Sequence, residues 1–395
     1  MSAMRIGIVL SSGPGYSETF FKTKIIGLSK IGTEVILFAR GETNPELNCK
    51  HIRPYPVFKH PLLRALCVVL ILPVVFLRAP RSVVRYWKFE KEDGQRSIEI
   101  FRSLYLNAHI LTNRVDWLHF GFATIALGRE NVAMAIEAKM GVSLRGYDIN
   151  VYPVDNPGCY TQVWRRVNQV HSISEYLIRQ AYTLGLSRDK QFQVITPALE
   201  IPEYFKDNFE TGDPIHLVTV ARLTRIKGLT YGLQAIARLK DQGKKVRYVI
   251  VGDGPDEDEL KALVESLGLQ NEVIFKGVLT HQETLNQIKS SDIYIQPSIN
   301  EGFCNAVLEA QSLQCLCVAS DTGALPENIC NNETGWLVKP QDPIALASKI
   351  QYVLQLSYEE KERIATSARQ RVIKNFKMEQ HLSLWKTFYY SINRK

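Results

Sequence analysis

The sequence predicts an α/β protein of two domains, each built on a doubly wound parallel sheet. The chain has 395 residues, more than one hydrophobic core usually supports, so two domains with a cleft between them are expected. An apolar run, an amphipathic stretch and a second apolar run open the chain, and the same succession starts again at residue 215. Parallel strands require such helical crossovers, so each succession begins a sheet of its own.

The first domain is predicted at residues 1–205. RIGIVL at 5–10 and EVILFAR at 34–40 are its first two strands. The loop SSGPGYSE and the amphipathic TFFKTKIIGLSKIG lie between them, which gives the order strand, loop, helix, strand. A crossover of this length between two apolar strands favours a parallel, doubly wound sheet.

The second domain is predicted at residues 206–375. IHLVTVARL is its first strand, LTYGLQAIARLKDQGK the crossover helix and VRYVIVGDG at 246–254 the second strand. Further strands follow in VIFKG, DIYIQPS at 292–298 and LQCLCVAS at 313–320. The loops after such strands open at the carboxyl edge of the sheet, where ligands of open α/β sheets collect. We therefore expect Gly252, Glu301 and Gly323 to line one crevice.

The end of the chain is predicted to be helical from about residue 360. It finishes in HLSLWKTFYYSI, whose aromatic residues indicate packing against another surface. We expect residues 376–395 to form a helix that packs on the N-terminal domain.

Composition indicates a globular chain in a reducing compartment. Hydrophobic residues make up 45% and charged residues 22%, which excludes a largely disordered protein. The seven cysteines include no C-x2-C pair, and MSAMRIGIVL does not resemble a signal peptide, so a cytoplasmic location is expected. Cys315 and Cys317 are interpreted as buried strand residues rather than metal ligands.

The positive charge is concentrated in the first half of the chain. Residues 1–200 hold 25 Lys/Arg and 16 Asp/Glu, a net of +9, whereas residues 201–395 hold 23 and 24, a net of −1. The basic half is expected to face an anionic partner. Nucleic acid, an anionic membrane and a phosphorylated substrate all fit, and charge by itself does not choose between them.

Residues 57–88 form a basic and apolar segment with six Lys/Arg and no acid. The uninterrupted apolar part, residues 65–77, is shorter than the roughly 20 residues that cross a bilayer. Basic flanks with Tyr86 and Trp87 nearby are typical of a helix that lies in the headgroup region of an anionic membrane. The alternative is a buried helix of the first domain with a basic flank.

The segment E301-GFCNAVL-E309 is the leading candidate site. It follows the strand DIYIQPS and opens a helix, so the backbone amides of Gly302, Phe303, Cys304 and Asn305 form a potential anion site. Glu301 and Glu309 flank that site, and a carboxylate there accepts hydrogen bonds from sugar or ribose hydroxyls. Two acids at this spacing are common by chance, so the segment needs support from a second element.

ARLTRIKG at 221–228 supplies that support. It follows a strand and carries Arg222 and Lys227 into the loop before a helix. Two fixed cations there would reach a diphosphate and stabilise the negative charge that grows on it as a leaving group. The alternative is a pair of ordinary surface cations on a basic protein.

These motifs, in this order, resemble the donor domain of the GT-B retaining glycosyltransferases of family 4, also called glycosyl transferases group 1. The resemblance covers roughly residues 215–340 and includes VGDGP at 251–255 and FKG at 275–277. It implies two Rossmann-like domains facing a central cleft. It also implies a nucleotide-diphosphate sugar, UDP- or GDP-linked, as donor and a hexosyl transfer. The implied contacts are the diphosphate for Arg222 and Lys227, the ribose for Glu309, the sugar for Glu301, and the donor for Gly15, Gly252, Gly277 and Val278.

The first domain resembles, more loosely, a subgroup that makes exopolysaccharides of the colanic-acid type and other surface polysaccharides. SSGPGYSETFF, WLHFGF, SLRGYDI and HSISEYL carry this likeness. Many relatives have His at the position of Arg145, so a role borrowed from that His does not transfer. His119, Arg145 and Asp148 are candidates for the acceptor or sugar side. With the segment 57–88, the likeness favours a saccharide or lipid-linked acceptor at the inner face of the cytoplasmic membrane and no nucleic acid.

No metal or other cofactor is predicted. D256-E257-D258 has the D-x-D form that binds divalent cations in other nucleotide-sugar enzymes, but it follows Pro255 in the first turn of a helix. Acids at that position complement the helix dipole.

Three other functions share some of these features. A nicotinamide-dependent oxidoreductase also has such domains, but SSGPGYSE lacks the G-x-G-x-x-G fingerprint. A retaining glycosidase needs two carboxylates across a sugar, whereas Glu301 and Glu309 flank an anion site. A non-catalytic nucleotide-binding subunit of polysaccharide assembly remains open because of Arg145.

Overall fold

A computed structural model describes residues 3–14, 19–42 and 47–390. The chain divides into two compact units. The first unit comprises Met1–Ile173, Leu177–Ile195 and His381–Lys395, and the second comprises Ser174–Tyr176 and Thr196–Gln380. The second unit therefore starts before the predicted residue 206, and the end of the chain returns to the first unit.

The first unit is built on a seven-stranded sheet in the order β3-β2-β1-β4-β5-β6-β7, and all its strand pairs are parallel. Chain order reverses between β1 and β4, which makes the carboxyl ends of these two strands a topological switch point. The strands are β1 (Arg5–Ser12), β2 (Glu34–Arg40), β3 (Lys50–Ile52), β4 (Trp117–Phe120), β5 (Lys139–Leu144), β6 (Gln169–Ser172) and β7 (Gln191–Val194).

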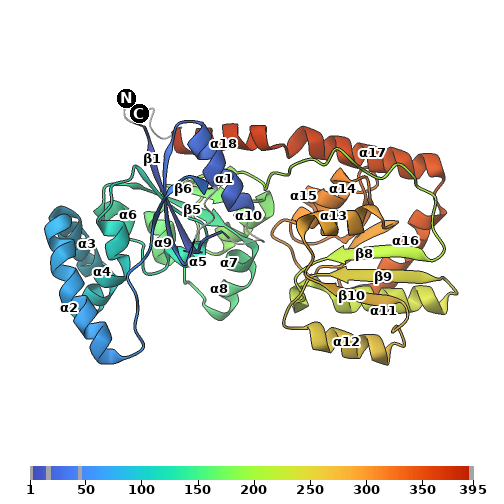
Figure 1. Cartoon of the computed structure of the whole chain (residues 1–395), viewed down its shortest axis with the longest axis horizontal. Helices are drawn as coiled ribbons and strands as arrows, with labels where there is room; N and C mark the ends of the chain where they lie inside the picture. Colours follow the sequence, from blue (N-terminus) through green and yellow to red (C-terminus); the bar gives the residue numbers. More distant parts are fainter. Residues whose placement is uncertain (1–2, 15–18, 43–46, 391–395) are drawn as a thin grey trace. The chain divides into compact units, whose positions relative to one another are not determined.

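Helices cover this sheet because its inner strands are buried on both faces, as the all-buried pattern of β4 illustrates. Figure 1 shows α2, α3 and α4 grouped on one side of the unit. The helices are α1 (Thr19–Lys30), α2 (Pro61–Arg78), α3 (Pro80–Glu92), α4 (Ser97–Leu111), α5 (Ala123–Ala126), α6 (Val132–Ala135), α7 (Gly146–Asn150), α8 (Tyr152–Asp155), α9 (Thr161–Arg166) and α10 (Glu175–Thr183).

The second unit is built on a six-stranded parallel sheet in the order β10-β9-β8-β11-β12-β13. Its strands are β8 (Ile215–Val220), β9 (Val246–Val251), β10 (Val273–Gly277), β11 (Ile293–Gln296), β12 (Leu316–Ser320) and β13 (Trp336–Val338). Its helical elements are η3 (Arg225–Lys227), α11 (Leu229–Asp241), α12 (Glu257–Ser266), α13 (His281–Lys289), α14 (Asn305–Ser312), α15 (Leu325–Asn328), α16 (Pro343–Gln355) and α17 (Tyr358–Asn375). The predicted two-domain α/β architecture is confirmed.

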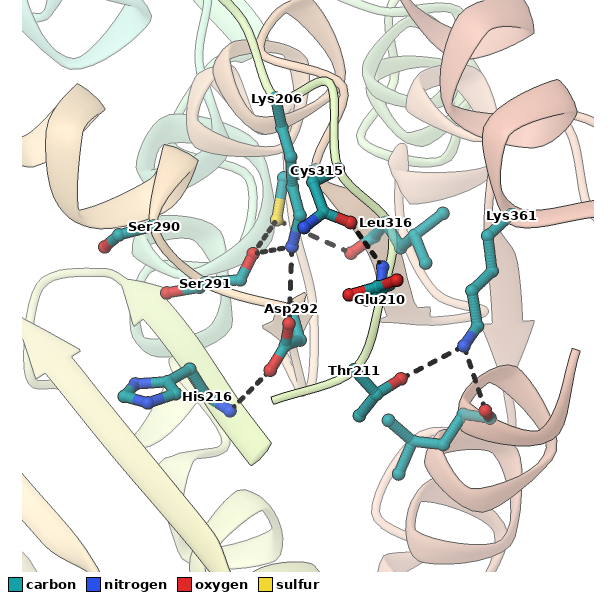
Figure 2. A network of polar contacts seen from close by, with 12 residues as sticks. Lys206, Glu210, Thr211, His216, Ser290, Ser291, Asp292, Cys315, Leu316 and Lys361 are labelled. Atoms are coloured by element: carbon teal, nitrogen blue, oxygen red, sulfur yellow. Dashed lines mark hydrogen bonds and ion pairs between the residues drawn. The ribbon is translucent and has the colours of Figure 1, made fainter. Parts of the chain in front are cut away.

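A polar cluster fixes the segment before β8 to the second unit (Figure 2). The ammonium of Lys206 lies 3.3 Å from Asp292 Oδ1 and donates to the carbonyl of Ser291 at 2.8 Å. The other oxygen of Asp292 accepts from the amide of His216 at 2.8 Å. Asp292 directly precedes β11, so the cluster lies at the amino edge of the sheet. These bonds hold the segment around Lys206 on the sheet of the second unit.

The predicted C-terminal helix is two helices, α17 and α18 (Met378–Tyr390). The break is at Phe376, whose carbonyl accepts from the amide of Leu199 at 3.0 Å, while its ring lies 6.0 Å from that of Phe303. Both contacts turn the backbone out of its helical path. The single continuous helix expected from about residue 360 is therefore wrong in this detail.

The aromatic residues of α18 belong to the core of the first unit. Trp385, Phe388 and Tyr389 are buried with residues of β1 and β2, and Figure 1 shows α18 in red beside α1. The indole of Trp117 donates to the carbonyl of Tyr389 at 3.1 Å. The last helix thus completes a core that begins with β1, although nearly the whole chain separates them.

The basic and apolar segment 57–88 forms α2 and α3. Tyr86 is fully buried and accepts a hydrogen bond from Asn107 at 3.3 Å, while Trp87 packs on Phe101 with ring centroids 4.9 Å apart. The expectation that Tyr86 lies at a membrane interface is therefore wrong, because it is on the side of α3 that packs against the first unit. In the described part of the chain no single helix passes as a membrane span; α2 from Ala65 and α3 pass only as a pair bent by 112°.

Candidate functional site

The carboxyl edge of the second sheet carries a compact polar network centred on Glu301. Lys227 from the loop after β8 donates to Glu301 Oε1 at 2.6 Å, and Ser298 donates to the same oxygen at 2.9 Å. Gln296, the last residue of β11, bonds Ser298 at 2.8 Å and is 3.3 Å from Glu301. Its amide oxygen accepts from the hydroxyl of Tyr294 at 2.6 Å. The loop after β8 and the end of β11 thereby hold one carboxylate.

The Lys227–Glu301 ion pair is partly sheltered, with 24% of the lysine side chain and 6% of the glutamate side chain exposed. Burial favours a neutral amine, but the adjacent carboxylate of Glu301 more than compensates and raises the pKa of Lys227 above its ordinary value. Lys227 is therefore a firmly charged ammonium at neutral pH, and its partially exposed position leaves it accessible to an anion.

Glu309 lies in the middle of α14, eight residues after Glu301 in the sequence, and its side chain is 18% exposed. Its carboxylate is 3.2 Å from His281 Nε2 at the start of α13. That contact raises the pKa of His281 above its ordinary value. Among the described residues the carboxylate has a largely exposed imidazole as its side-chain partner, which it can exchange for a hydroxyl.

The backbone amides that open α14 are only partly available for an anion. The amide of Cys304 donates to the side chain of Asn328 at 3.1 Å, so it already has a partner in this structure. Within the described residues, no hydrogen bond is found from the amides of Gly302, Phe303 and Asn305. The side-chain amide of Asn328 also donates to the carbonyl of Cys304 at 3.2 Å, which fixes the turn before the helix.

The glycines of this edge allow close approach of backbone segments. Gly252 has φ 127°, and a Cβ built there would lie 2.0 Å from the carbonyl oxygen of Ala221. Gly323 has φ 57°, and its Cβ would lie 2.2 Å from the carbonyl oxygen of Glu301. Side chains at either position would push apart the loops that carry Arg222 and Glu301.

The remaining donor-side candidates differ in their surroundings. Arg222 is exposed in the loop after β8. Gly277 ends β10 with φ 64°, and Val278 follows it with 62% of its surface exposed. Gly15, predicted on the donor side, lies outside the described residues.

The D-x-D sequence at 256–258 lies at the start of α12, as its place directly after Pro255 predicts. Asp256 caps α12, Glu257 and Asp258 are in its first turn, and Glu257 pairs with Lys261 at 2.6 Å. Among the described residues no group of three or more His, Cys, Asp or Glu side chains is arranged to hold a metal ion.

His119 is part of a buried hydrogen-bonded chain in the first unit. Its Nδ1 is 2.9 Å from the hydroxyl of Tyr389 and its Nε2 is 2.8 Å from Ser143 Oγ. Ser143 Oγ is 2.7 Å from Nδ1 of His171, whose Nε2 is 2.9 Å from the carbonyl of Ile195. Burial lowers the pKa of each histidine well below its ordinary value, so both are neutral. A carbonyl only accepts, so His171 donates to it from Nε2, and Nδ1 of the neutral ring accepts from Ser143. Ser143 then accepts from His119, and His119 accepts from Tyr389.

His119 is fully buried, and both of its ring nitrogens have partners within the unit. His119 therefore links α18 to the sheet of the first unit through its hydrogen bonds. These partners could not be predicted from the sequence, since Ser143, His171 and Tyr389 come from three separate segments.

Asp148 is also fully buried, in α7. Its Oδ1 accepts from the hydroxyl and the amide of Thr124 at 2.7 and 3.2 Å, which holds the start of α5. Burial raises the pKa of Asp148 to about 6, although the bonds from Thr124 oppose this. Arg145 at the end of β5 is 8% exposed, and its guanidinium lies 3.7 Å from the ring centroid of Phe20.

Several residues of the site were not predicted from the sequence. Ser298 and Gln296 had a usable signal, because both are polar residues at the carboxyl end of a strand. His281 and Asn328 had none, since they reach Glu309 and Cys304 from other helices.

Known proteins are similar to this chain both in sequence and in fold. The sequence profile described as Glycosyl transferases group 1 matches residues 200–371. A putative colanic acid biosynthesis glycosyltransferase of Escherichia coli, WcaL, is 26% identical over 400 residues, covering 94% of this chain and 96% of the relative. The amylovoran biosynthesis glycosyltransferase AmsK of Erwinia amylovora is 27% identical, covering 67% of each chain.

Solved structures share the fold. A glycosyltransferase from Rickettsia africae superposes with a TM-score of 0.69 at 19% identity and covers the whole of both chains. Anabaena HepE, solved with UDP and glucose, superposes with a TM-score of 0.71 at 16% identity, covering 98% of this chain and 100% of HepE. The predicted GT-B fold and the predicted family resemblance are confirmed.

Proposed function

Because residues 200–371 match the glycosyl transferases group 1 domain, we propose that the protein is a retaining glycosyltransferase that acts in exopolysaccharide biosynthesis. It transfers a hexosyl group from a UDP- or GDP-linked sugar to a saccharide or lipid-linked acceptor. The observation that carries the proposal is the Lys227–Glu301 pair, 2.6 Å apart at the carboxyl edge of the second sheet. WcaL and AmsK, named for colanic acid and amylovoran biosynthesis, support the choice of product class.

We propose that the donor binds along the carboxyl edge of the second sheet. Arg222 and Lys227 contact the diphosphate, Glu309 accepts from the ribose hydroxyls, and Glu301 accepts from hydroxyls of the transferred sugar. Gly252 directly follows β9, Gly277 ends β10 and Val278 follows it, all at the same edge of the sheet. HepE, which was solved with UDP-glucose, supports a nucleotide sugar as the ligand class.

The reaction breaks the bond between the anomeric carbon and the diphosphate oxygen. The acceptor oxygen forms the new bond on the same face of the sugar, so the anomeric configuration is retained. The acceptor proton passes to the departing phosphate, and a nucleoside diphosphate is released. Fixed cations stabilise the charge that develops on that phosphate, so neither a metal ion nor a side-chain nucleophile takes part.

Replacing Glu309 by alanine is expected to weaken binding of the nucleotide sugar at least tenfold, because the two ribose hydroxyls lose a charged acceptor. Thermal shift with UDP-, GDP- and ADP-sugars identifies the donor, and calorimetry then measures its Kd in both proteins. Glu265→Ala, on the exposed side of α12, is the matched control. A Kd that is unchanged in Glu309→Ala refutes the donor assignment.

We also propose that α2 attaches the protein to the cytoplasmic face of an anionic membrane. One side of this helix is wholly apolar and open to solvent, with Leu62 73%, Val69 67% and Leu77 81% exposed. The other exposed members of this apolar side are Leu63, Leu66, Leu70, Val74 and Phe76. Such a stripe, about 24 Å long at 1.5 Å per residue, suits a helix lying in the plane of the interface.

Basic residues beside this apolar side favour a lipid surface over a second protein. Lys59 and Arg78 are exposed at the two ends of α2, Arg81 is exposed in the first turn of α3, and residues 57–88 contain no acid. Each basic residue near an anionic surface adds to the attraction.

Replacing Leu66 and Leu70 together by aspartate is expected to reduce vesicle binding at least tenfold, because two charges would enter the apolar face. Co-sedimentation with vesicles containing phosphatidylglycerol, against pure phosphatidylcholine, measures it. Ile344→Asp, an equally exposed apolar position of the second unit, is the control. If the double variant dissociates an oligomer and binds vesicles normally, the face is a protein interface instead.

A further inference from the structure

A pocket of about 290 Å³ opens in the first unit where chain order reverses between β1 and β4. Ser11 and Arg40 reach it from the ends of β1 and β2, and Thr124 reaches it from α5, which follows β4. In open α/β sheets this crevice outside the carboxyl ends of the strands is where ligands bind. His119, the acceptor-side candidate, does not line it, and Asp148 lies behind it, bonded to Thr124.

The charged side chains that line this pocket are cationic. Arg40 and Arg129 both line it, and none of the described residues that line it is acidic. Burial lowers the pKa of Arg129 and the charge of Arg40 lowers it further, while Tyr86 and Glu130 oppose the shift. Two guanidinium groups that repel each other at one pocket are stabilised by an anion placed between them.

Two residues that line the pocket each have a buried side-chain nitrogen atom with no hydrogen-bond partner among the described residues. These are Nε of Arg129 and Nδ1 of His109. His109 is 6% exposed, and burial with the nearby positive charge of Arg129 lowers its pKa to about 4. Arg129 uses Nη1 to donate to the carbonyl of Ile125 at 2.9 Å, which fixes the guanidinium in the wall.

The rest of the wall is apolar and includes Phe38, Leu106 and Val57. The volume is near the lower limit of about 300 Å³ for pockets that hold a complete small-molecule ligand, so it fits a group within a larger substrate. Val57 is half exposed and directly precedes the segment that forms the apolar face of α2.

The geometry points to a phosphate-binding subsite for the acceptor, in which Arg40 and Arg129 clamp a phosphate or diphosphate group. Guanidinium groups bind phosphate oxygens in pairs of charge-assisted hydrogen bonds, which suits this arrangement. The inference rests on the proposed transferase function, because it identifies the acceptor as a phosphorylated, lipid-linked saccharide.

Calorimetry on the full chain tests the subsite with inorganic pyrophosphate as the probe. The parent protein carries Lys227→Ala, which weakens the diphosphate contacts on the donor side. Arg40→Gln and Arg129→Gln in this parent are each expected to raise the Kd for pyrophosphate about tenfold or more. Arg40 is exposed, so its replacement leaves the fold intact even if Arg129→Gln lowers the melting temperature. Lys244→Gln, an exposed cation of the second unit, is the control.

Unchanged pyrophosphate binding in both arginine variants overturns the inference, as does binding of glucuronate in preference to pyrophosphate. Tighter binding of farnesyl diphosphate than of pyrophosphate identifies a lipid-linked source, and equal binding identifies the phosphate group alone. Donor binding is measured separately on the unmodified chain with nucleotide sugars. Its failure would refute the proposed function without altering the pyrophosphate result.

Discussion

Replacing Lys227 by methionine is expected to lower kcat for sugar transfer about 100- to 1,000-fold, the usual cost of removing one fixed group aimed at developing charge. The ammonium lies 2.6 Å from Glu301 and remains 24% exposed, so it is both held in place and accessible to a diphosphate. Methionine keeps an unbranched chain of similar length and removes only the charge. Initial rates with the donor found by thermal shift measure the effect.

Glu301→Gln tests whether the pair works as one unit. The two side chains share one hydrogen-bonded network, so the double variant Lys227→Met with Glu301→Gln should lose much less than the product of the single losses. Lys244→Met, an exposed position of the second unit, should leave kcat unchanged. A kcat for Lys227→Met within threefold of the wild-type value contradicts the role given to this lysine.

Replacing Phe388 by alanine is expected to lower the free energy of unfolding of the first unit by about 3–5 kcal/mol. Phe388 is completely buried, and its ring lies 5.7 Å from Trp117 of β4 and 5.6 Å from Trp385. The cavity would open between α18 and the sheet, where both tryptophans report it. Urea denaturation followed by tryptophan fluorescence measures the change.

The neighbouring surface of α18 supplies the control for this stability prediction. Lys386 is exposed on the same helix, so Lys386→Ala should change the free energy of unfolding by no more than about 0.5 kcal/mol. If Phe388→Ala changes stability as little as Lys386→Ala does, α18 is not part of the core of the first unit.

The strands and crossover helices were predictable because their signal is local. EVILFAR became β2 at the same residues, and the acids after Pro255 lie at the start of α12 as the dipole argument requires. Likewise, Glu301 follows a strand by a few residues, so its place at the carboxyl edge of the sheet follows from the strand alone.

Other expectations were wrong where they depended on which side of a helix faces the core or on the residue at which a helix ends. Tyr86 is of a residue type that is common at membrane interfaces. It lies on the side of α3 that faces the first unit, however, and its hydroxyl accepts a hydrogen bond from Asn107. Phe376 lies within a run that reads as one helix, and contacts to Leu199 and Phe303 end it there. Neither partner is near in sequence, so no local pattern contains the information.

The sequence by itself determined the two parallel sheets, the family of the second domain and the position of Glu301, Arg222 and Lys227 in loops at one edge. Each of these depends on hydrophobic periodicity or on motifs of a few residues. Only the tertiary structure decided that His119 is bonded to Ser143 and Tyr389, and that Arg40 and Arg129 meet in one pocket. Such encounters depend on strand order and helix packing, which bring together side chains that the sequence keeps far apart.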